Sequence, residues 1–355
     1  MIIRAPSRLH MSLIDLNGSY KRIDGGIGLA LSDPQFVLES QETNEKGYTL
    51  EFADGIREDS IEECNDKIPK AAEKIAELCN IESGFHFKVL EAYPAHSGLG
   101  SGTQISVCTA HLMTETAGLK FTSRELSTMV GRGGTSGIGT FAHDLGGFIV
   151  DGGHSLEEKP GFLPSSASKA KPATLIARYE FPEDWNILLA MPEVEEHMHA
   201  QQEVNVFQTY CPIPKTEVEQ VSHLILMNLL PFLLEKDIVN FGWAIKELQK
   251  VGFNKLEHSL DPHYLPAMEA MDAAGAYGTG ISSFGPTLYT VFDENNKDDI
   301  NKLNYQIILH NNFQVHHKML PSHHTSWKCP RNRRHPDRRK RQCCAAPRKW
   351  RSSGR

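Results

Sequence analysis

A glycine-rich segment between a predicted strand and a predicted helix constrains the fold of this chain more than any other feature. Residues 94–103 read Pro-Ala-His-Ser-Gly-Leu-Gly-Ser-Gly-Thr. A strand-like run over 85–92 precedes them, and an apolar, helix-like run over 104–116 follows. Three glycines let the backbone turn so that several N–H groups converge, and the start of the helix adds the positive end of its dipole. With two serines and a threonine as further donors, the segment predicts a site for a phosphate or diphosphate.

The surrounding pattern excludes two common phosphate-binding loops. No Gly-Lys-Ser or Gly-Lys-Thr ends the segment, so it is not a Walker loop. It also lacks the Gly-x-Gly-x-x-Gly spacing after the first strand of a βαβ unit that dinucleotide-binding proteins need. The plain alternative is a tight turn that needs glycine only for its backbone shape.

Two more glycine-rich segments follow along the chain. Residues 131–139 read Gly-Arg-Gly-Gly-Thr-Ser-Gly-Ile-Gly, in which Arg132 is able to pair with a phosphate in bidentate fashion. Residues 278–287 read Gly-Thr-Gly-Ile-Ser-Ser-Phe-Gly-Pro-Thr and predict a turn before a strand. The plain alternative for residues 131–139 is a mobile surface loop. Residues 278–287 alone are only a weak indication of a ligand site.

Predicted strands and helices follow one another without a strict βαβα order, which favours an α+β fold in two lobes. A long helix is expected over 216–235, with a kink or a break at Pro231. The main predicted strands are 2–4, 26–31, 36–40, 48–52, 185–191 and 287–292, and the main predicted helices are 68–79, 104–116, 122–130, 237–251 and 265–274.

Charged residues divide the chain into two parts of opposite sign. Residues 316–355 hold 13 of the 37 Lys and Arg and one acid, Asp337, whereas residues 1–315 hold 43 acids against 24 bases, a net charge of −19. A body this acidic repels nucleic acid, so we expect none to bind there. The basic segment lacks apolar periodicity. A nucleic-acid-binding arm is one interpretation, and a disordered or out-of-frame end that replaces the last strand is the one we favour.

Cysteine usage and apolar runs indicate a cytoplasmic protein. Seven cysteines, mostly scattered, are typical of reduced thiols rather than of a disulfide framework. The first ten residues form no signal-peptide pattern, and the longest apolar run, around 224–234, is too short to cross a bilayer. We therefore expect no membrane partner.

In this order, and with Ala-Pro-Ser-Arg-Leu-His at 5–10, the three segments resemble those of the galactokinase, homoserine kinase, mevalonate kinase and phosphomevalonate kinase (GHMP kinase) superfamily. The resemblance covers residues 1–315. It implies an ATP-binding-like, two-lobe α+β fold with the site between the lobes. The N-terminal lobe, 1–180, would be ribosomal S5 domain 2-like, and the C-terminal lobe, 181–315, ferredoxin-like. The resemblance also implies a homodimer.

One departure separates this chain from many kinases of that group. They carry Ser-Gly-Ile-Asp or Ser-Gly-Val-Asp in the middle segment, with the Asp near the hydroxyl that is phosphorylated, whereas this chain has Ser136-Gly137-Ile138-Gly139. Glycine cannot act as a base or orient a nucleophile. The segments instead look like those of the non-kinase branch, the β-ribofuranosylaminobenzene 5′-phosphate synthases, as do Asp151-Gly152-Gly153-His154 and residues 282–287.

That resemblance implies a pentosyltransferase of methanopterin biosynthesis. Phosphoribosyl diphosphate and 4-hydroxybenzoate or 4-aminobenzoate would give an aryl C-riboside 5′-phosphate, CO2 and diphosphate. The phosphate loop and Mg²⁺ would stabilise the departing diphosphate, and positioning would bring an electron-rich ring carbon to C1 of the ribose. The alternatives are an ATP-dependent small-molecule kinase of the same fold and a non-catalytic phosphate-ligand binding protein.

The candidate site residues come from these motifs. Those for phosphate or diphosphate binding are Ser97, Gly98, Leu99, Gly100, Ser101, Gly102, Thr103, Arg132, Ser136, Ser282 and Ser283. The candidate catalytic residues are Arg8, His10, Asp24, Asp144, Asp151 and His154. The aspartates are candidates for Mg²⁺ or for shielding a cationic transition state, and the others for the 5′-phosphate or the carboxylate. Plain alternatives are a surface base for Arg8, a satisfied strand histidine for His10 and a helix cap for Asp144. The sequence assigns no metal ligand.

Overall fold

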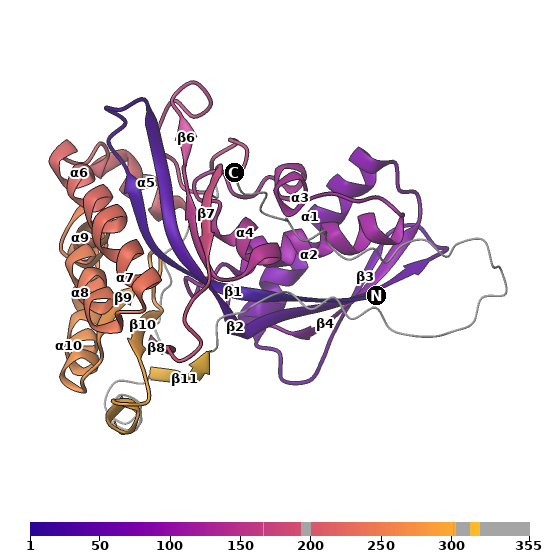
Figure 1. The fold of residues 1–355 in the computed structure, drawn as a ribbon. Helices are drawn as coiled ribbons and strands as arrows, with labels where there is room; N and C mark the ends of the chain where they lie inside the picture. The colour runs from indigo at the N-terminus through magenta and orange to yellow at the C-terminus, as the bar shows by residue number, and fades with distance from the viewer. Residues whose placement is uncertain (166, 193–199, 301, 303–312, 320–355) are drawn as a thin grey trace, which may run out of the picture.

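Two β-sheets carry the part of the chain that the structure, a computed structural model, describes: residues 1–165, 167–192, 200–300, 302 and 313–319. The first sheet has seven strands, β1 to β7, between residues 2 and 179, and the second has four, β8 to β11, between residues 186 and 319. Helices pack beside each sheet (Figure 1). Residue 180, the expected end of the N-terminal lobe, lies in the connection between β7 and β8.

The first sheet is organised around one long antiparallel pair. β1 (Ile2–Asp15) pairs with β2 (Arg22–Thr43) along nearly its whole length. The other strands are β3 (Tyr48–Phe52), β4 (Gly84–Glu91), β5 (Phe148–Asp151), β6 (His154–Ser155) and β7 (Leu175–Tyr179). The strand order is β3-β4-β2-β5-β7, with β1 and β6 paired to β2. β3 runs parallel to β4, and the other pairs are antiparallel.

β1 and β2 are much longer than the strands predicted over 2–4, 26–31 and 36–40. Nearly every residue of β1 from 5 to 13 is buried, on both faces of the strand. A strand buried on both faces shows no alternation of apolar and polar residues, so its length is hidden in the sequence. Pro6 is tolerated inside β1 because it lies at a register shift, where the ladder is interrupted.

Helices α1 (Glu58–Cys79), α2 (Ser101–Thr116), α3 (Ser123–Val130) and α4 (Ile138–Leu145) lie together on one side of the first sheet (Figure 1). Ile68 of α1 is buried in the same core as Phe85 and Phe87 of β4. α1 begins ten residues before the predicted start, so Pro69 lies in its interior. Asn65, whose carbonyl loses its N–H partner because proline has none, is exposed to water.

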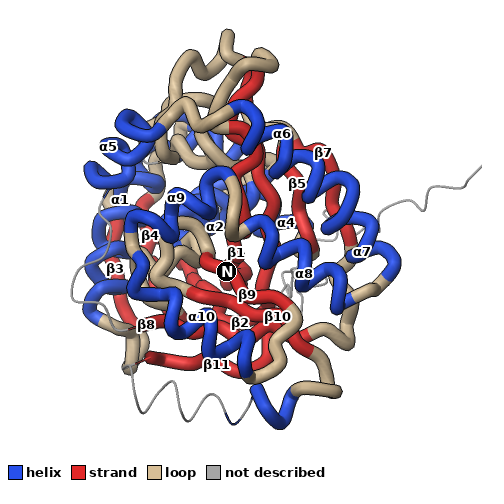
Figure 2. Tube along the Cα trace, turned by 90° about the vertical axis from the view of Figure 1, so that its left-hand side faces the viewer, coloured by secondary structure: helices blue, strands red, loops and turns tan. Residues whose placement is uncertain are grey.

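The second sheet, in the order β11-β8-β10-β9, is antiparallel throughout. Its strands are β8 (Asn186–Pro192), β9 (Gly278–Ile281), β10 (Leu288–Phe292) and β11 (Phe313–Met319). Its helices are α5 (Ala200–Tyr210), α6 (Lys215–Leu224), α7 (Leu230–Glu235), α8 (Ile238–Leu248), α9 (Gly252–Leu260) and α10 (Leu265–Ala273). Figure 2 shows α8 and α10 in front of this sheet. Within the described residues, no helix has the length and apolar character needed to cross a membrane.

The helix predicted over 216–235 is interrupted near Pro231. A π-helical turn, η1 (Ile225–Leu229), separates α6 from α7 just before this proline. Proline has no N–H to donate, and its ring crowds the carbonyl four residues earlier, so the regular ladder cannot continue through it. The predicted helix is therefore present as continuous helical turns from 215 to 235, and its α-helical pattern is interrupted by the π turn just before Pro231.

The last described strand continues beyond Val315, where the sequence analysis places the end of the body. Within β11, Val315 pairs with Ala190, His316 with Leu189 and Met319 with Ile187. The first four residues of the basic segment therefore extend the edge of the second sheet. Residues 320–355 lie outside the described part of the chain, and the interpretation of them stays a prediction.

Candidate functional site

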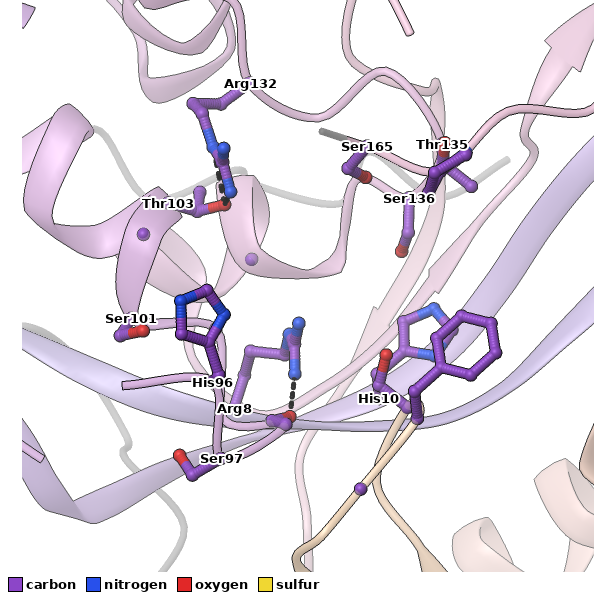
Figure 3. A pocket seen from close by; sticks show the side chains of 18 of the residues that line it. Arg8, His10, His96, Ser97, Ser101, Thr103, Arg132, Thr135, Ser136 and Ser165 are labelled. Atoms are coloured by element: carbon purple, nitrogen blue, oxygen red, sulfur yellow. Dashed lines mark hydrogen bonds between the residues drawn. The ribbon is translucent and has the colours of Figure 1, made fainter. Parts of the chain in front are cut away.

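A pocket of about 260 Å³ lies where the three glycine-rich segments meet. Its walls come from β1, from residues 96–103, 132–139 and 283–285, and from α1, α5 and α9. Figure 3 shows the polar side chains that line it. The predicted site residues that line the pocket are Arg8, His10, Ser97, Gly98, Gly100, Ser101, Gly102, Thr103, Arg132, Ser136 and Ser283.

The first glycine-rich segment is held between β1 and the turn that follows β9. The Arg8 N–H donates to Leu99 O at 3.0 Å, and the Arg8 guanidinium donates through Nη1 to Gly98 O. Ser282 Oγ also donates to Gly98 O, at 2.9 Å, and accepts the His10 N–H at 3.0 Å. Leu99 and Ser282 therefore position the segment, although neither lines the pocket.

α2 begins directly after this segment and presents its N-terminus to the pocket. Its N-cap is Gly100, at φ +83°, and no side chain caps its first turn. The N–H groups at a helix start have no intrahelical partner and carry the positive end of the dipole. Ser101, Gly102 and Thr103, the first three residues of α2, all line the pocket. This arrangement suits a phosphate or diphosphate.

Three charged side chains surround Gly102. The position that a Cβ would take there is 2.9 Å from Glu63 Oε1, 3.3 Å from Arg132 Nη2 and 3.5 Å from Lys67 Cε. Arg132 donates through Nε and Nη2 to Thr103 Oγ1, both at 3.3 Å (Figure 3). Glu63 Oε2 is buried and has no hydrogen-bond partner. A carboxylate oxygen with unused lone pairs therefore lies beside the anion-binding helix start.

The sequence analysis missed Glu63 and Lys67. They lie four residues apart on α1 and so share one face of it. The predicted helix began at residue 68, after both of them. The signal that could have found them is an acidic and a basic residue four positions apart, on a helix that starts before residue 63.

Ser136 lies on another wall and contacts a buried carboxylate. Its Oγ donates to Asp151 Oδ2 at 3.1 Å, and the N–H groups of Gly137 and Gly153 donate to the same carboxylate at 2.9 and 3.0 Å. Burial raises the pKa of Asp151 to about 6, although these hydrogen bonds act in the opposite direction. Asp151 does not line the pocket. It lies behind Ser136, where its hydrogen bonds to residues 136 and 137 orient the second glycine-rich segment.

We expect Asp151 to make the protein less stable as the pH rises from about 4 to about 6. Its pKa rises from the ordinary 3.8 to about 6, so the folded chain holds the proton more tightly than the unfolded chain. This stabilisation is fully present below the unfolded pKa and is lost as the pH rises through the folded one. At 1.36 kcal/mol per unit, the loss is about 3 kcal/mol.

The difference in the free energy of unfolding between the wild type and Asp151→Asn, measured from pH 3 to pH 8, isolates this group. As the pH rises from about 4 to about 6, the free energy of unfolding of the wild type should fall relative to that of Asp151→Asn. A difference that does not vary with pH would contradict the assignment.

Asp24 and His154 form a buried cluster with Lys159 beside the pocket rather than in its lining. His154 Nδ1 donates to Asp24 Oδ2 at 2.6 Å, and Lys159 Nζ donates to the same oxygen at 2.9 Å. Lys159 also donates to Thr135 Oγ1 at 3.0 Å. Burial lowers the pKa of Lys159, and the charge of Asp24 opposes this. Because Thr135 lines the pocket, the cluster fixes part of its wall.

His10 lines the pocket with a neutral imidazole. The residue is 6 % exposed, and its Nε2 is buried without a hydrogen-bond partner. Burial, reinforced by the charge of Arg8, lowers the pKa of His10 to about 3. The alternative of a satisfied strand histidine therefore does not hold for Nε2. A neutral ring offers a hydrogen bond to a ligand without adding positive charge.

Asp144 lies outside the pocket lining. α4 begins beside the pocket, where Gly139 is part of the lining, and carries Asp144 away from it by about 1.5 Å per residue. The Asp144 carboxylate accepts the Ser123 N–H at 3.2 Å, at the start of α3. It therefore serves the start of that helix and does not line the pocket. Its candidate role with Mg²⁺ or a cationic transition state stays a prediction.

Comparisons of the sequence with known proteins give a family-level match. The profile described as GHMP kinases N terminal domain matches residues 66–147. The beta-ribofuranosylphenol 5'-phosphate synthase of Methanothermobacter thermautotrophicus is 50% identical over 295 residues, which cover 83% of this chain and 89% of that protein. A protein of the same name from Archaeoglobus fulgidus is 44% identical over 82% of this chain and 88% of its own length.

Solved structures share the fold at low sequence identity. The mevalonate kinase of Methanococcus jannaschii matches with a TM-score of 0.64 at 16% identity, over 90% of this chain and 98% of its own. The homoserine kinase of Cytophaga hutchinsonii matches with a TM-score of 0.62 at 16% identity, over 90% of this chain and 95% of its own. The α+β GHMP kinase fold predicted from the sequence is therefore confirmed.

Proposed function

We propose, because this chain belongs to the family of beta-ribofuranosylphenol 5'-phosphate synthases, that it is an enzyme that joins phosphoribosyl diphosphate to a 4-substituted benzoate. The acceptor is 4-hydroxybenzoate or 4-aminobenzoate, and the pathway is methanopterin biosynthesis. The bond between C1 of the ribose and the diphosphate breaks, and its electron pair leaves with diphosphate. The ring carbon that bears the carboxylate bonds to C1. The carboxylate then leaves as CO2 and returns its bonding pair to the ring.

The observation that carries this proposal is a phosphate cradle without a carboxylate at residue 139. Gly139 lines the pocket, and a Cβ on it would lie 3.3 Å from Thr103 Cγ2. Among the described residues of the pocket lining, Glu63 has the single carboxylate, and it lies by Gly102 instead. The aspartate that many kinases of this fold place near the reacting hydroxyl has no counterpart at residue 139. Departure of diphosphate needs only stabilisation of the anion and positioning of the acceptor.

The leaving diphosphate would meet groups that are already aligned. The N-terminus of α2 offers its N–H groups, and Arg8, Lys67 and Arg132 bring positive charge to the same end of the pocket. Donors that are fixed before the reaction stabilise charge as it develops, without reorganisation in the transition state. This concentration of positive charge lies in a body whose net charge is −19.

Mg²⁺ suits the same end of the pocket. The unpartnered Glu63 Oε2 and the hydroxyls of Ser101 and Thr103 are oxygen donors of the kind that Mg²⁺ takes. The described residues contain no group of three or more His, Cys, Asp or Glu suited to a metal. That agrees with an ion held by one carboxylate and by substrate phosphates, which is common for Mg²⁺. When bound, it would neutralise charge on the leaving diphosphate.

Arg132→Gln should raise KM for phosphoribosyl diphosphate by about 10- to 100-fold, since a charge-assisted hydrogen bond contributes about 1.5–3 kcal/mol. The KM for the benzoate should change little. The matched control is Arg124→Gln, because Arg124 donates to Pro172 O at 3.2 and 3.0 Å and does not line the pocket. Steady-state kinetics with each substrate varied in turn separate the two. Equal effects of both variants would remove Arg132 from the site.

The proposal is tested by incubating the full chain with phosphoribosyl diphosphate, Mg²⁺ and 4-hydroxybenzoate, and by measuring free diphosphate. Release should depend on the benzoate, and 4-aminobenzoate in a parallel reaction ranks the two acceptors. Consumption of ATP with an alcohol, and no reaction with phosphoribosyl diphosphate, would favour the kinase alternative instead.

A further inference from the structure

Three phenylalanines from separate parts of the chain meet at the pocket. Phe207 lies on α5, Phe253 on α9 and Phe284 in the turn after β9. The rings of Phe207 and Phe253 are stacked, with centroids 5.8 Å apart. Phe284 stands edge-on to both, at 6.0 Å from Phe207 and 5.1 Å from Phe253. All three line the pocket, and we call them the phenylalanine cluster.

This cluster is the open side of an apolar core rather than its centre. Phe207 and Phe253 are buried, with Leu13, in one hydrophobic group of side chains, and Phe284 packs against that group while partly exposed. Phe162 packs against the same apolar group and is also partly buried, but it does not line the pocket.

β1 shows how far the cluster lies from the phosphate-binding end. Arg8 contacts the phosphate loop, His10 follows two residues later, and Leu13 belongs to the apolar group behind the cluster. At about 3.3 Å per residue, Arg8 and Leu13 are roughly 16 Å apart along the strand. Figure 3 shows Arg8, Ser101 and Arg132 toward one side of the pocket and His10 toward the other. A diphosphate, a ribose and one aromatic ring placed end to end match this length.

We propose that the phenylalanine cluster is the subsite for the aromatic ring of the benzoate acceptor. This inference rests on the proposed function and adds the place and orientation of the second substrate. Aromatic rings prefer offset-stacked and edge-to-face partners, and the cluster offers both a stacked pair and an edge-on ring.

The ring carbon that bonds to the ribose must face the phosphate end. The carboxylate therefore lies toward His10, and the 4-substituent points into the apolar group. The neutral imidazole of His10 lines the pocket between the two substrate positions, while its Nε2 is buried on the side of Gly26.

Phe284→Leu tests the subsite, with Phe162→Leu as the matched control. Phe284→Leu removes an aromatic partner and should raise KM for 4-hydroxybenzoate about 5- to 10-fold, while KM for phosphoribosyl diphosphate stays within about twofold. Phe162→Leu makes the same chemical change outside the pocket lining and should leave both KM values unchanged. Calorimetric titration of each folded variant with 4-hydroxybenzoate, in the presence of Mg²⁺ and inorganic diphosphate, should show the same weakening without turnover.

Phe207→Leu is the second cluster variant, in case the turn at Phe284 does not tolerate the change. If the wild type forms product and neither cluster variant changes the KM or the binding of 4-hydroxybenzoate, the subsite is wrong and the proposed function stands. If the effect on phosphoribosyl diphosphate equals that on the benzoate, the subsite is also overturned. If the wild type binds 4-hydroxybenzoate through the cluster but forms no product, the proposed function fails and the ring subsite stands.

Discussion

Gly98→Ala should lower kcat/KM for phosphoribosyl diphosphate by at least about 100-fold, the scale of losing a fixed anion donor. Gly98 adopts φ +79°, and a Cβ there would lie 2.3 Å from Ser282 O and 3.0 Å from Gly285 O. Both are backbone atoms, which cannot rotate away as a side chain can. The first glycine-rich segment must therefore separate from the third, and the N–H groups that face the anion lose their alignment.

Gly118→Ala is the control for backbone strain. Gly118 adopts φ +77°, but no heavy atom lies within 4 Å of the Cβ position. The variant therefore carries the same left-handed strain, about 1–2 kcal/mol, without the collision. We expect its kinetics to match the wild type. Steady-state rates and circular dichroism of both variants separate the causes. A Gly98→Ala enzyme with unchanged affinity for phosphoribosyl diphosphate would remove this segment from the site.

Asp24→Asn should reduce the free energy of unfolding by about 3–5 kcal/mol, the usual cost of leaving one member of a buried ion pair without its partner. Asp24 is 1 % exposed and Lys159 is 3 % exposed. Lys159 Nζ donates to both carboxylate oxygens, at 3.1 and 2.9 Å. The amide of asparagine leaves the ammonium group with no opposite charge in the cluster. Thr135 and the segment around Leu163, which Lys159 also holds, should loosen as a result.

Urea unfolding of three variants checks this cost. The double variant Asp24→Asn/Lys159→Met removes both charges and should recover part of the lost stability. Glu294→Gln breaks an exposed ion pair with Lys297 and should change stability by less than about 1 kcal/mol. A double variant no more stable than Asp24→Asn would mean that the charges are not coupled.

The phosphate-binding residues could be predicted from the sequence because their chemistry is local. An anion cradle needs glycines, hydroxyls and a helix start within about ten residues, and residues 97–103 carry all three. Arg132 was predicted from its place in the second glycine-rich segment and Arg8 from the resemblance of residues 5–10, and both line the pocket. The roles of these residues in catalysis stay predictions, as do the homodimer and Mg²⁺.

The residues that the sequence did not reveal reach the site through tertiary packing. Phe207 and Phe253 come from helices α5 and α9, which the sequence analysis did not predict. Glu63 lies in the first half of α1, before the predicted helix start at residue 68. Lys159 is 135 residues from Asp24 along the chain, and no local pattern joins them. Asp144 is close in sequence to the second glycine-rich segment but does not line the pocket, because closeness in sequence says nothing about the direction of α4.

The proposed reaction is tested most directly with carboxyl-labelled 4-hydroxybenzoate. Labelled CO2 and free diphosphate are measured together from phosphoribosyl diphosphate and Mg²⁺, with the wild type and with Gly98→Ala. Carbon–carbon bond formation at the carboxyl-bearing carbon predicts one CO2 for each diphosphate with the wild type, and a loss of both products with the variant. Diphosphate released without labelled CO2, or no release by the folded wild type, would contradict it.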